Sequence, residues 1–61
     1  MTTDLVVLNY ATGEVDFYYF DMNLDSDAIE DFLFNQKKYR ETEISWMFGE
    51  QLFINNYGNN Y

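Results

Sequence analysis

Residues 21–27 are the part of the chain whose side-chain types and spacing come nearest to a metal site. Oxygen-bearing side chains stand there at every second position: Asp21, Asn23, Asp25 and Asp27. A calcium loop begins in this way, but it requires glycine at its sixth position and a bidentate glutamate at its twelfth. Counted from Asp21, those positions hold Ser26 and Phe32. We therefore interpret the segment as a strand-to-helix connection in which Asp25 caps a helix, and we predict no metal site and no cofactor.

The residue types needed for acid–base or nucleophilic catalysis are scarce. The chain has no His and no Cys, which removes the commonest general base, the reactive thiol and the usual zinc ligands. Ser26 and Ser45 have no evident basic partner in the sequence. A catalytic carboxylate pair needs a cleft that holds both groups at a fixed separation, and so short a chain rarely encloses a substrate pocket of about 300–1,000 Å³. We predict that the protein is not an enzyme.

The charge of the chain is unevenly distributed. Eleven acids against three bases give a net charge of −8, and all the bases lie within residues 37–40. Residues 1–36 hold no base, and their acids are Asp4, Glu14, Asp16, Asp21, Asp25, Asp27, Glu30 and Asp31. Such a chain repels nucleic-acid phosphates and anionic lipid and attracts basic protein surfaces. The acids either keep the protein soluble or form a recognition surface that imitates a row of phosphates, and charge alone does not decide between these two interpretations.

Two segments rich in β-forming residues, 5–10 and 15–20, flank a glycine-containing connection at 11–14, which predicts a hairpin. The register favoured by the apolar pattern places Tyr10 opposite Val15. One face of the hairpin is then entirely apolar or aromatic: Val6, Leu8, Tyr10, Val15, Phe17 and Tyr19. The other face is mixed: Leu5, Val7, Asn9, Asp16, Tyr18 and Phe20. We expect the apolar face to contribute to the core.

Residues 26–38 have the pattern of an amphipathic helix. Acids lie near its beginning and bases at its end, and both placements complement the helix dipole. At the α-helical spacing, Ile29, Phe32 and Leu33 share one face. Phe34 points about 200° away from Phe32 in that geometry, so we predict that it faces outward.

Residues 43–56 predict two short strands joined at Gly49 and Glu50, since glycine suits the first position of a type II′ turn. Trp46 would then face Phe53 across the hairpin. One longer strand with a bulge at Gly49 is the alternative.

These elements predict a single α+β domain over residues 1–56. Its order is ββαββ, with one helix packed on one face of an antiparallel sheet. Residues 57–61 form an Asn/Tyr/Gly tail that we expect to be poorly ordered unless a partner holds it.

Aromatic residues make up 21% of the chain and exceed what the predicted core uses. The aromatic residues assigned to the core are Phe17, Tyr19, Phe32, Trp46 and Phe53. Those outside the predicted core faces are Tyr18, Phe20 and Phe34. Exposed aromatic side chains mark interfaces, and one helix covers only one face of a sheet. The sequence therefore predicts partner binding or self-association, with a homodimer as the expected form.

In size, charge and hairpin-then-helix order, the chain resembles small acidic inhibitors encoded by phages and plasmids. Those proteins block uracil-DNA glycosylase, restriction enzymes or CRISPR effectors, and several imitate DNA. The resemblance implies a non-catalytic inhibitor or adaptor that docks on a basic surface of a nucleic-acid-binding protein, with no direct binding to nucleic acid or membrane. The predicted partner-binding residues are Asp16, Tyr18, Asp21, Asp25, Asp27, Glu30, Asp31 and Phe34. The alternative is a homo-oligomeric structural or accessory module assembled through Tyr18, Phe20, Phe34 or the tail.

The N-terminal residues carry no basic region, and the apolar run at 5–8 is too short for a signal peptide or a membrane span. We therefore expect a soluble protein of the cytoplasm.

Overall fold

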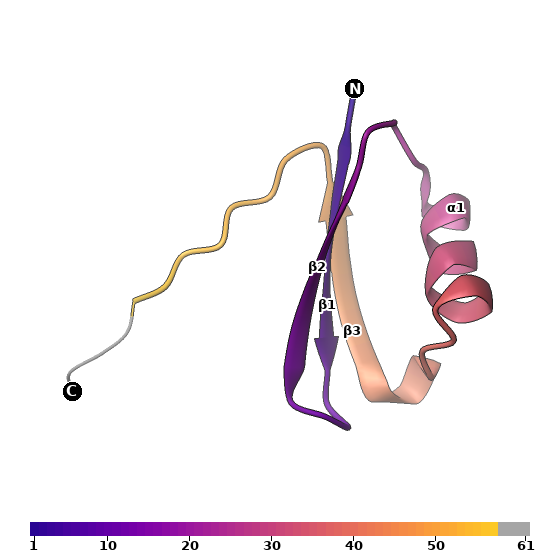
Figure 1. The fold of residues 1–61 in the computed structure, drawn as a ribbon, viewed down its shortest axis with the longest axis vertical. Coiled ribbons are helices and arrows are strands. Elements are labelled where there is room, and N and C mark those ends of the chain that lie inside the picture. The colour runs from indigo at the N-terminus through magenta and orange to yellow at the C-terminus, as the bar shows by residue number, and fades with distance from the viewer. Residues whose placement is uncertain (58–61) are drawn as a thin grey trace.

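The computed structural model describes residues 1–57 and places one helix against one face of a three-stranded antiparallel sheet (Figure 1). The strands are β1 (Thr3–Asn9), β2 (Glu14–Phe20) and β3 (Ile44–Gly49). The helical elements are α1 (Ser26–Glu30), its π-helical continuation η1 (Asp31–Gln36) and the short 3₁₀ helix η2 (Glu41–Glu43). The predicted α+β class is confirmed. The tail predicted at 57–61 lies, apart from its first residue, outside the described residues.

The second strand of the predicted C-terminal hairpin is not formed within the described residues, so their order is ββαβ. β3 ends at Gly49, and residues 51–57 carry no helix or strand. Phe53 was predicted to lie in the core, and that prediction was wrong because the side chain is exposed. The chain leaves the sheet here because the backbone N–H of Leu52 donates to the carboxylate of Asp4 (3.0 Å) instead of joining a strand ladder.

β1 is the central strand, in the order β2-β1-β3, and its helix-facing side chains form the middle of the core. The buried hydrophobic side chains are Leu5, Val7, Ile29, Leu33 and Ile44. Alternation along β1 places Leu5 and Val7 on one face of the sheet, and a spacing of four places Ile29 and Leu33 on one side of the helix. Half-buried side chains packed around this cluster are Tyr18, Phe20, Leu24, Phe32, Phe34, Tyr39, Trp46 and Phe48.

The register of the β1–β2 hairpin differs by two residues from the predicted one, because Val15 lies opposite Leu8 instead of Tyr10. Asn9 ends β1, since its side-chain Oδ1 accepts a hydrogen bond from the backbone N–H two residues later (3.0 Å). Its carbonyl oxygen accepts from the N–H of Gly13 (2.8 Å), and Gly13 has a φ of 76°, which glycine adopts without steric cost. A shift of two residues leaves each strand side chain on the face predicted for it.

The helix covers the face of the hairpin opposite to the one that we predicted to be in the core. The side chains towards the helix come from the mixed face of the hairpin and from β3: Leu5, Val7, Tyr18, Phe20, Trp46 and Phe48. Phe17 and Tyr19 are exposed on the other face, so their assignment to the core was wrong. Aromatic contacts favour the observed arrangement. The ring of Phe32 meets those of Tyr18 and Phe20 edge to face, with centroids 5.0 and 4.9 Å apart.

The second half of the helix is wound as a π-helix, and this reverses the predicted orientation of Phe34. The N–H of Lys37 donates to the carbonyl oxygen of Phe32 (2.8 Å), which is the i→i+5 pattern. The wider turn rotates Phe34 back towards the sheet, where its ring meets that of Trp46 edge to face at 5.4 Å between centroids. The prediction of an outward Phe34 was wrong because it assumed 100° per residue. The helix ends at Gln36, and the φ of 64° at Lys38 prevents further winding.

Candidate functional site

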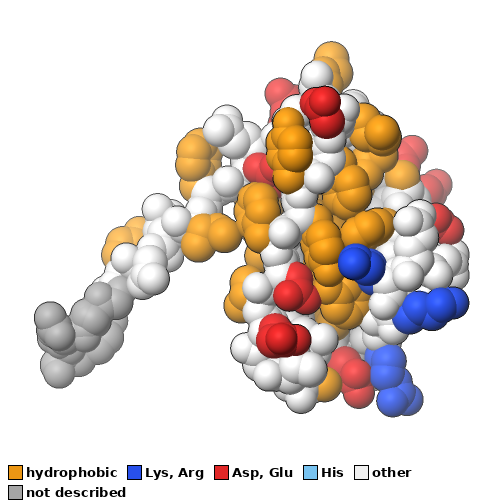
Figure 2. Space-filling view, viewed as in Figure 1, with side chains coloured by type: hydrophobic (Ala, Val, Ile, Leu, Met, Phe, Trp, Pro, Cys, Tyr) orange, Lys and Arg blue, Asp and Glu red, His pale blue; other side chains and the backbone are white. Residues whose placement is uncertain are grey.

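Five exposed carboxylates follow the β2–α1 connection and the outer side of the helix, and we call this set the acidic ridge: Asp21, Asp25, Asp27, Glu30 and Asp31. Because Ile29 and Leu33 turn towards the sheet, the acids between and before them point to solvent. Figure 2 shows acidic side chains gathered beside the upper part of the helix and basic side chains below them. All five acids of the ridge are among the residues predicted to bind a partner, and the structure places them on the surface between the end of β2 and the middle of the helix.

Two acids of the ridge are held by local hydrogen bonds. Asp25 is the predicted N-cap, and its Oδ1 accepts from the N–H of Ala28 (2.9 Å). Asp31 accepts from the side-chain amides of Asn35 (2.7 Å) and Gln36 (3.2 Å). These two hydrogen bonds lower the pKa of Asp31, the one from Asn35 most strongly. Both carboxylates therefore hold defined positions, and Asp31 stays ionised to lower pH than an ordinary aspartate.

The three bases lie at the other end of the helix, away from the ridge. Arg40 Nη1 lies 3.9 Å from Glu43 Oε2, and this is the only ion pair within residues 1–57. Lys37 Nζ lies over the ring of Tyr18, 5.4 Å from its centroid, as a cation–π contact. Within the described chain no acid of the ridge is paired with a base.

Asp16 and Tyr18 belong to a hydrogen-bond chain on the helix side of β2. The hydroxyl of Tyr39 donates to Asp16 Oδ2 (2.7 Å), and the hydroxyl of Tyr18 bonds to that of Tyr39. Partial burial raises the pKa of Tyr39 well above its ordinary value of 10.0, and the hydrogen bonds to Tyr18 and Asp16 raise it further. The sequence reasoning missed Tyr39, because only the turn at Lys38 brings it back against β2.

Replacing Tyr39 by phenylalanine is expected to lower the free energy of unfolding at neutral pH by about 1–2 kcal/mol, because Asp16 loses its donor. The loss should shrink above pH 10. There the unfolded chain ionises Tyr39 while the folded protein keeps it protonated, so the stability of the unaltered protein falls as the pH rises. Urea denaturation at neutral and alkaline pH measures both effects. Tyr57→Phe, at an exposed ring, is the control, and an equal pH dependence in the two variants would contradict the assignment.

Phe34, Tyr18 and Phe20 were predicted to lie outside the core, and the structure places all three half-buried against it. Each ring takes part in an edge-to-face contact across the helix–sheet interface. The predicted orientation of these side chains was wrong. The partner-binding role assigned to Asp16, Tyr18 and Phe34 stays a prediction, but each of these side chains is engaged inside the protein.

The sheet face opposite the helix is uncovered, and we call it the open face: Val6, Leu8, Val15, Phe17, Tyr19 and Met47. All of these except the half-buried Val6 are exposed. The apolar face predicted from the alternation along the hairpin is therefore present in the structure, but it lies on the surface and not in the core. The open face therefore exposes several large apolar side chains on neighbouring strands.

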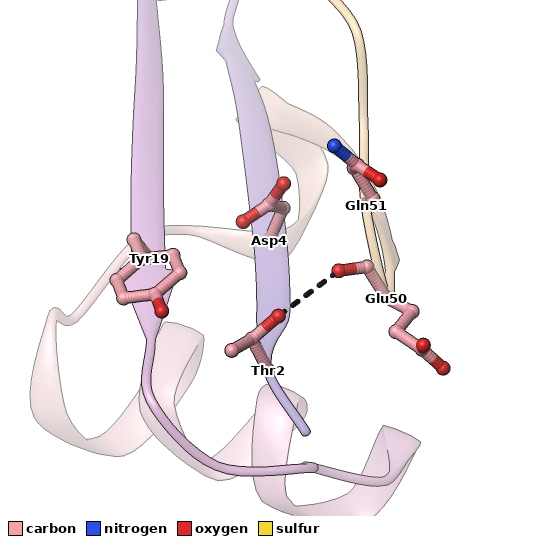
Figure 3. A pocket seen from close by; sticks show the side chains of 5 residues that line it. All are labelled: Thr2, Asp4, Tyr19, Glu50 and Gln51. Atoms are coloured by element: carbon pink, nitrogen blue, oxygen red, sulfur yellow. Dashed lines mark hydrogen bonds between the residues drawn. The ribbon is translucent and has the colours of Figure 1, made fainter.

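A shallow pocket of about 300 Å³ lies at one end of the open face (Figure 3). Its lining residues are Thr2, Asp4, Tyr19, Glu50 and Gln51. Asp4 already accepts the N–H of Leu52, and Figure 3 shows the carboxylate of Glu50 directed away from it. No group of three or more His, Cys, Asp or Glu side chains is placed to hold a metal ion anywhere in residues 1–57. The lining of the pocket thus contains the acids Asp4 and Glu50, the hydroxyl-bearing Thr2 and Tyr19, and the amide of Gln51.

Comparison with protein-family models, with curated proteins and with solved structures finds no match to this chain. In the described part of the chain, no helix has the length and apolar character that crossing a bilayer would need.

Proposed function

We propose that the protein is a small, acidic, non-catalytic binding protein of the cytoplasm. Through the acidic ridge it docks on a basic surface of a nucleic-acid-binding protein and acts as an inhibitor or adaptor. One observation carries the proposal: five exposed carboxylates lie within residues 21–31 with no base among them, and the three bases follow the end of the helix.

The spacing of the acids in the ridge suits docking on a partner surface that recognises phosphates. Asp27, Glu30 and Asp31 stand at i, i+3 and i+4 of the helix, so the Cβ atom of Asp27 lies about 5–6 Å from those of the other two. A DNA strand carries one charge for about every 3.4 Å of its axis, so the ridge presents charge at a similar order of density. A groove lined with Lys and Arg that accepts nucleic acid would attract such a row.

Solubility alone requires net charge but not segregation. Interspersed bases would reduce the repulsion among the acids while leaving the surface charged. The ridge instead keeps neighbouring carboxylates without a base between them, two of them fixed by hydrogen bonds. This arrangement supports a recognition surface, of the kind found in phage or plasmid inhibitors of restriction enzymes and CRISPR effectors that imitate DNA.

A competition assay tests the proposal. Labelled duplex DNA is bound to a purified uracil-DNA glycosylase, a restriction enzyme or a CRISPR effector, and the protein is titrated in at two salt concentrations. We expect displacement of DNA from at least one of these targets, with an affinity that falls by about 10-fold or more between 50 and 200 mM salt.

Two triple variants of equal charge separate recognition from net charge. The first, Asp27→Asn, Glu30→Gln and Asp31→Asn, neutralises the helical part of the ridge. The second, Glu14→Gln, Glu41→Gln and Glu50→Gln, neutralises exposed acids elsewhere. We expect the first to weaken displacement by about 10-fold or more and the second by less than about 3-fold. Equal losses in the two variants, or binding that ignores salt, would refute docking through the ridge.

A further inference from the structure

The open face leaves one side of the sheet exposed to solvent. The helix covers one side of the sheet only, as Figure 1 shows. On the other side Val15, Tyr19 and Met47 are each about 60% exposed, at 62%, 61% and 58%. Apolar side chains in such a continuous patch favour association, because burial removes them from water.

The charge of the open face fits a second copy of this chain better than a basic partner. Among the strand residues on this face, Asp4 is the only charged one, and it is 8% exposed and hydrogen-bonded to the N–H of Leu52. Two chains of net charge −8 repel each other overall. They meet least repulsion where their surfaces are neutral, and the ridge lies on the helix side, away from such a contact.

Residues 51–57, which we call the C-terminal arm, leave the body on the side of the open face. Figure 1 shows the arm and α1 on opposite sides of the sheet. Two hydrogen bonds fix where the arm starts: Leu52 N–H to Asp4 Oδ2 (3.0 Å) and Thr2 Oγ1 to the carbonyl oxygen of Glu50 (3.3 Å). A second molecule on the open face would therefore lie within reach of the arm.

The arm carries large apolar side chains that contribute nothing to the core of their own chain. Phe53, Ile54 and Tyr57 are 77%, 68% and 84% exposed. A sheet of three strands, each up to seven residues long, covers roughly 350 Å². A stable dimer buries about 800 Å² per partner. Each aromatic ring of the arm adds about 150–250 Å² when buried, which brings the contact close to that size.

We infer that two copies of the chain pack open face to open face about a two-fold axis, and that each C-terminal arm lies along the body of the other copy. The contact is isologous, so Phe17 and Met47 of one copy meet the same face of the second. Packing of the two sheets leaves a helix on each outer side and both ridges exposed. This interface is independent of the docking proposed above.

Sedimentation equilibrium on the full chain tests the inference. We expect a dimer at about 10 µM protein. Phe17→Glu, which places a charge in the centre of the open face, should raise the dimer dissociation constant by about 100-fold. The matched control is Met22→Glu, which adds the same charge at an exposed side chain of the β2–α1 connection, and its effect should stay below about 3-fold.

A double substitution in the arm provides a second and separate measurement. The variant with both Phe53→Ser and Tyr57→Ser removes the two rings of the arm and leaves every residue of the sheet unchanged. Misfolding caused by a substitution on the open face therefore cannot explain a loss of association in this variant. We expect the dissociation constant to rise by about 10-fold or more, with an unchanged circular dichroism spectrum. A protein that is monomeric at about 100 µM overturns the inference. So does a dimer indifferent to Phe17→Glu, or a nuclear Overhauser contact between Phe53 and Phe17 within a monomer.

Discussion

Replacing Leu33 by alanine is expected to lower the free energy of unfolding by about 3–4 kcal/mol. Leu33 is 0% exposed and lies in the cluster that joins the helix to β1, together with Leu5, Val7 and Ile29. A chain of this length has few other buried side chains to compensate, and small domains are marginally stable. A large fraction of the variant should therefore be unfolded at room temperature, as measured by urea denaturation followed by far-ultraviolet circular dichroism.

Leu8→Ala is the matched control for this prediction. It removes the same atoms from a leucine on the open face, which is 41% exposed. At a protein concentration too low for association, its cost should be below about 1 kcal/mol. Equal costs for the two variants would show that the open face is buried in the folded monomer, which contradicts both a core confined to the helix side of the sheet and the dimer contact.

The elements that could be predicted from the sequence are those that depend on nearby residues. The two strands of the hairpin, the helix start and its cap at Asp25 follow from β-propensity, periodicity and one hydrogen bond over three residues. The acidic ridge could be predicted for the same reason, because its members lie within eleven consecutive residues of one connection and one helix.

The covered face could not be predicted from the hairpin alone. Alternation separates two sets of side chains but does not say which set meets the helix. The mixed set includes Asp16, which seemed unsuited to a core. The structure accommodates Asp16 through the hydroxyl of Tyr39, a residue more than twenty positions away. Contacts between residues so far apart in the sequence leave no local pattern, and they decided which face of the hairpin the helix covers.

Two further predictions, the outward Phe34 and the C-terminal hairpin, were wrong because of local geometry. The π-helical winding moved Phe34 from the predicted outer side to Trp46, and an α-helical wheel has no means of detecting that change. After Gly49 the backbone N–H of Leu52 donates to the carboxylate of Asp4 and no return strand forms. The apolar residues 52–54 therefore do not pair with β3 as a hairpin. The result is the C-terminal arm, on which the dimer inference depends.

Replacing Thr3 by valine is expected to destabilise the protein by about 2–3 kcal/mol, although the shape of the side chain is kept. The hydroxyl of Thr3, at 2% exposure, accepts from the N–H of Leu24 and donates to the carbonyl oxygen of Met22, both at 2.9 Å. It thereby ties the start of β1 to the β2–α1 connection. The valine variant leaves that donor and that acceptor without a partner in a partly buried position, and urea denaturation measures the loss.

Two further variants separate the hydroxyl from other effects at Thr3. Thr3→Ser keeps both hydrogen bonds and should cost less than about 1 kcal/mol, while Thr2→Val alters the neighbouring, more exposed threonine and should cost about the same or less. Hydrogen exchange at the Leu24 amide gives a direct readout, because only Thr3→Val removes its acceptor and should accelerate it. If Thr3→Val leaves that exchange rate unchanged, the hydroxyl does not hold the connection. The placement of the helix, and with it the acidic ridge, would then rest on the buried aliphatic cluster and the aromatic contacts without the hydroxyl.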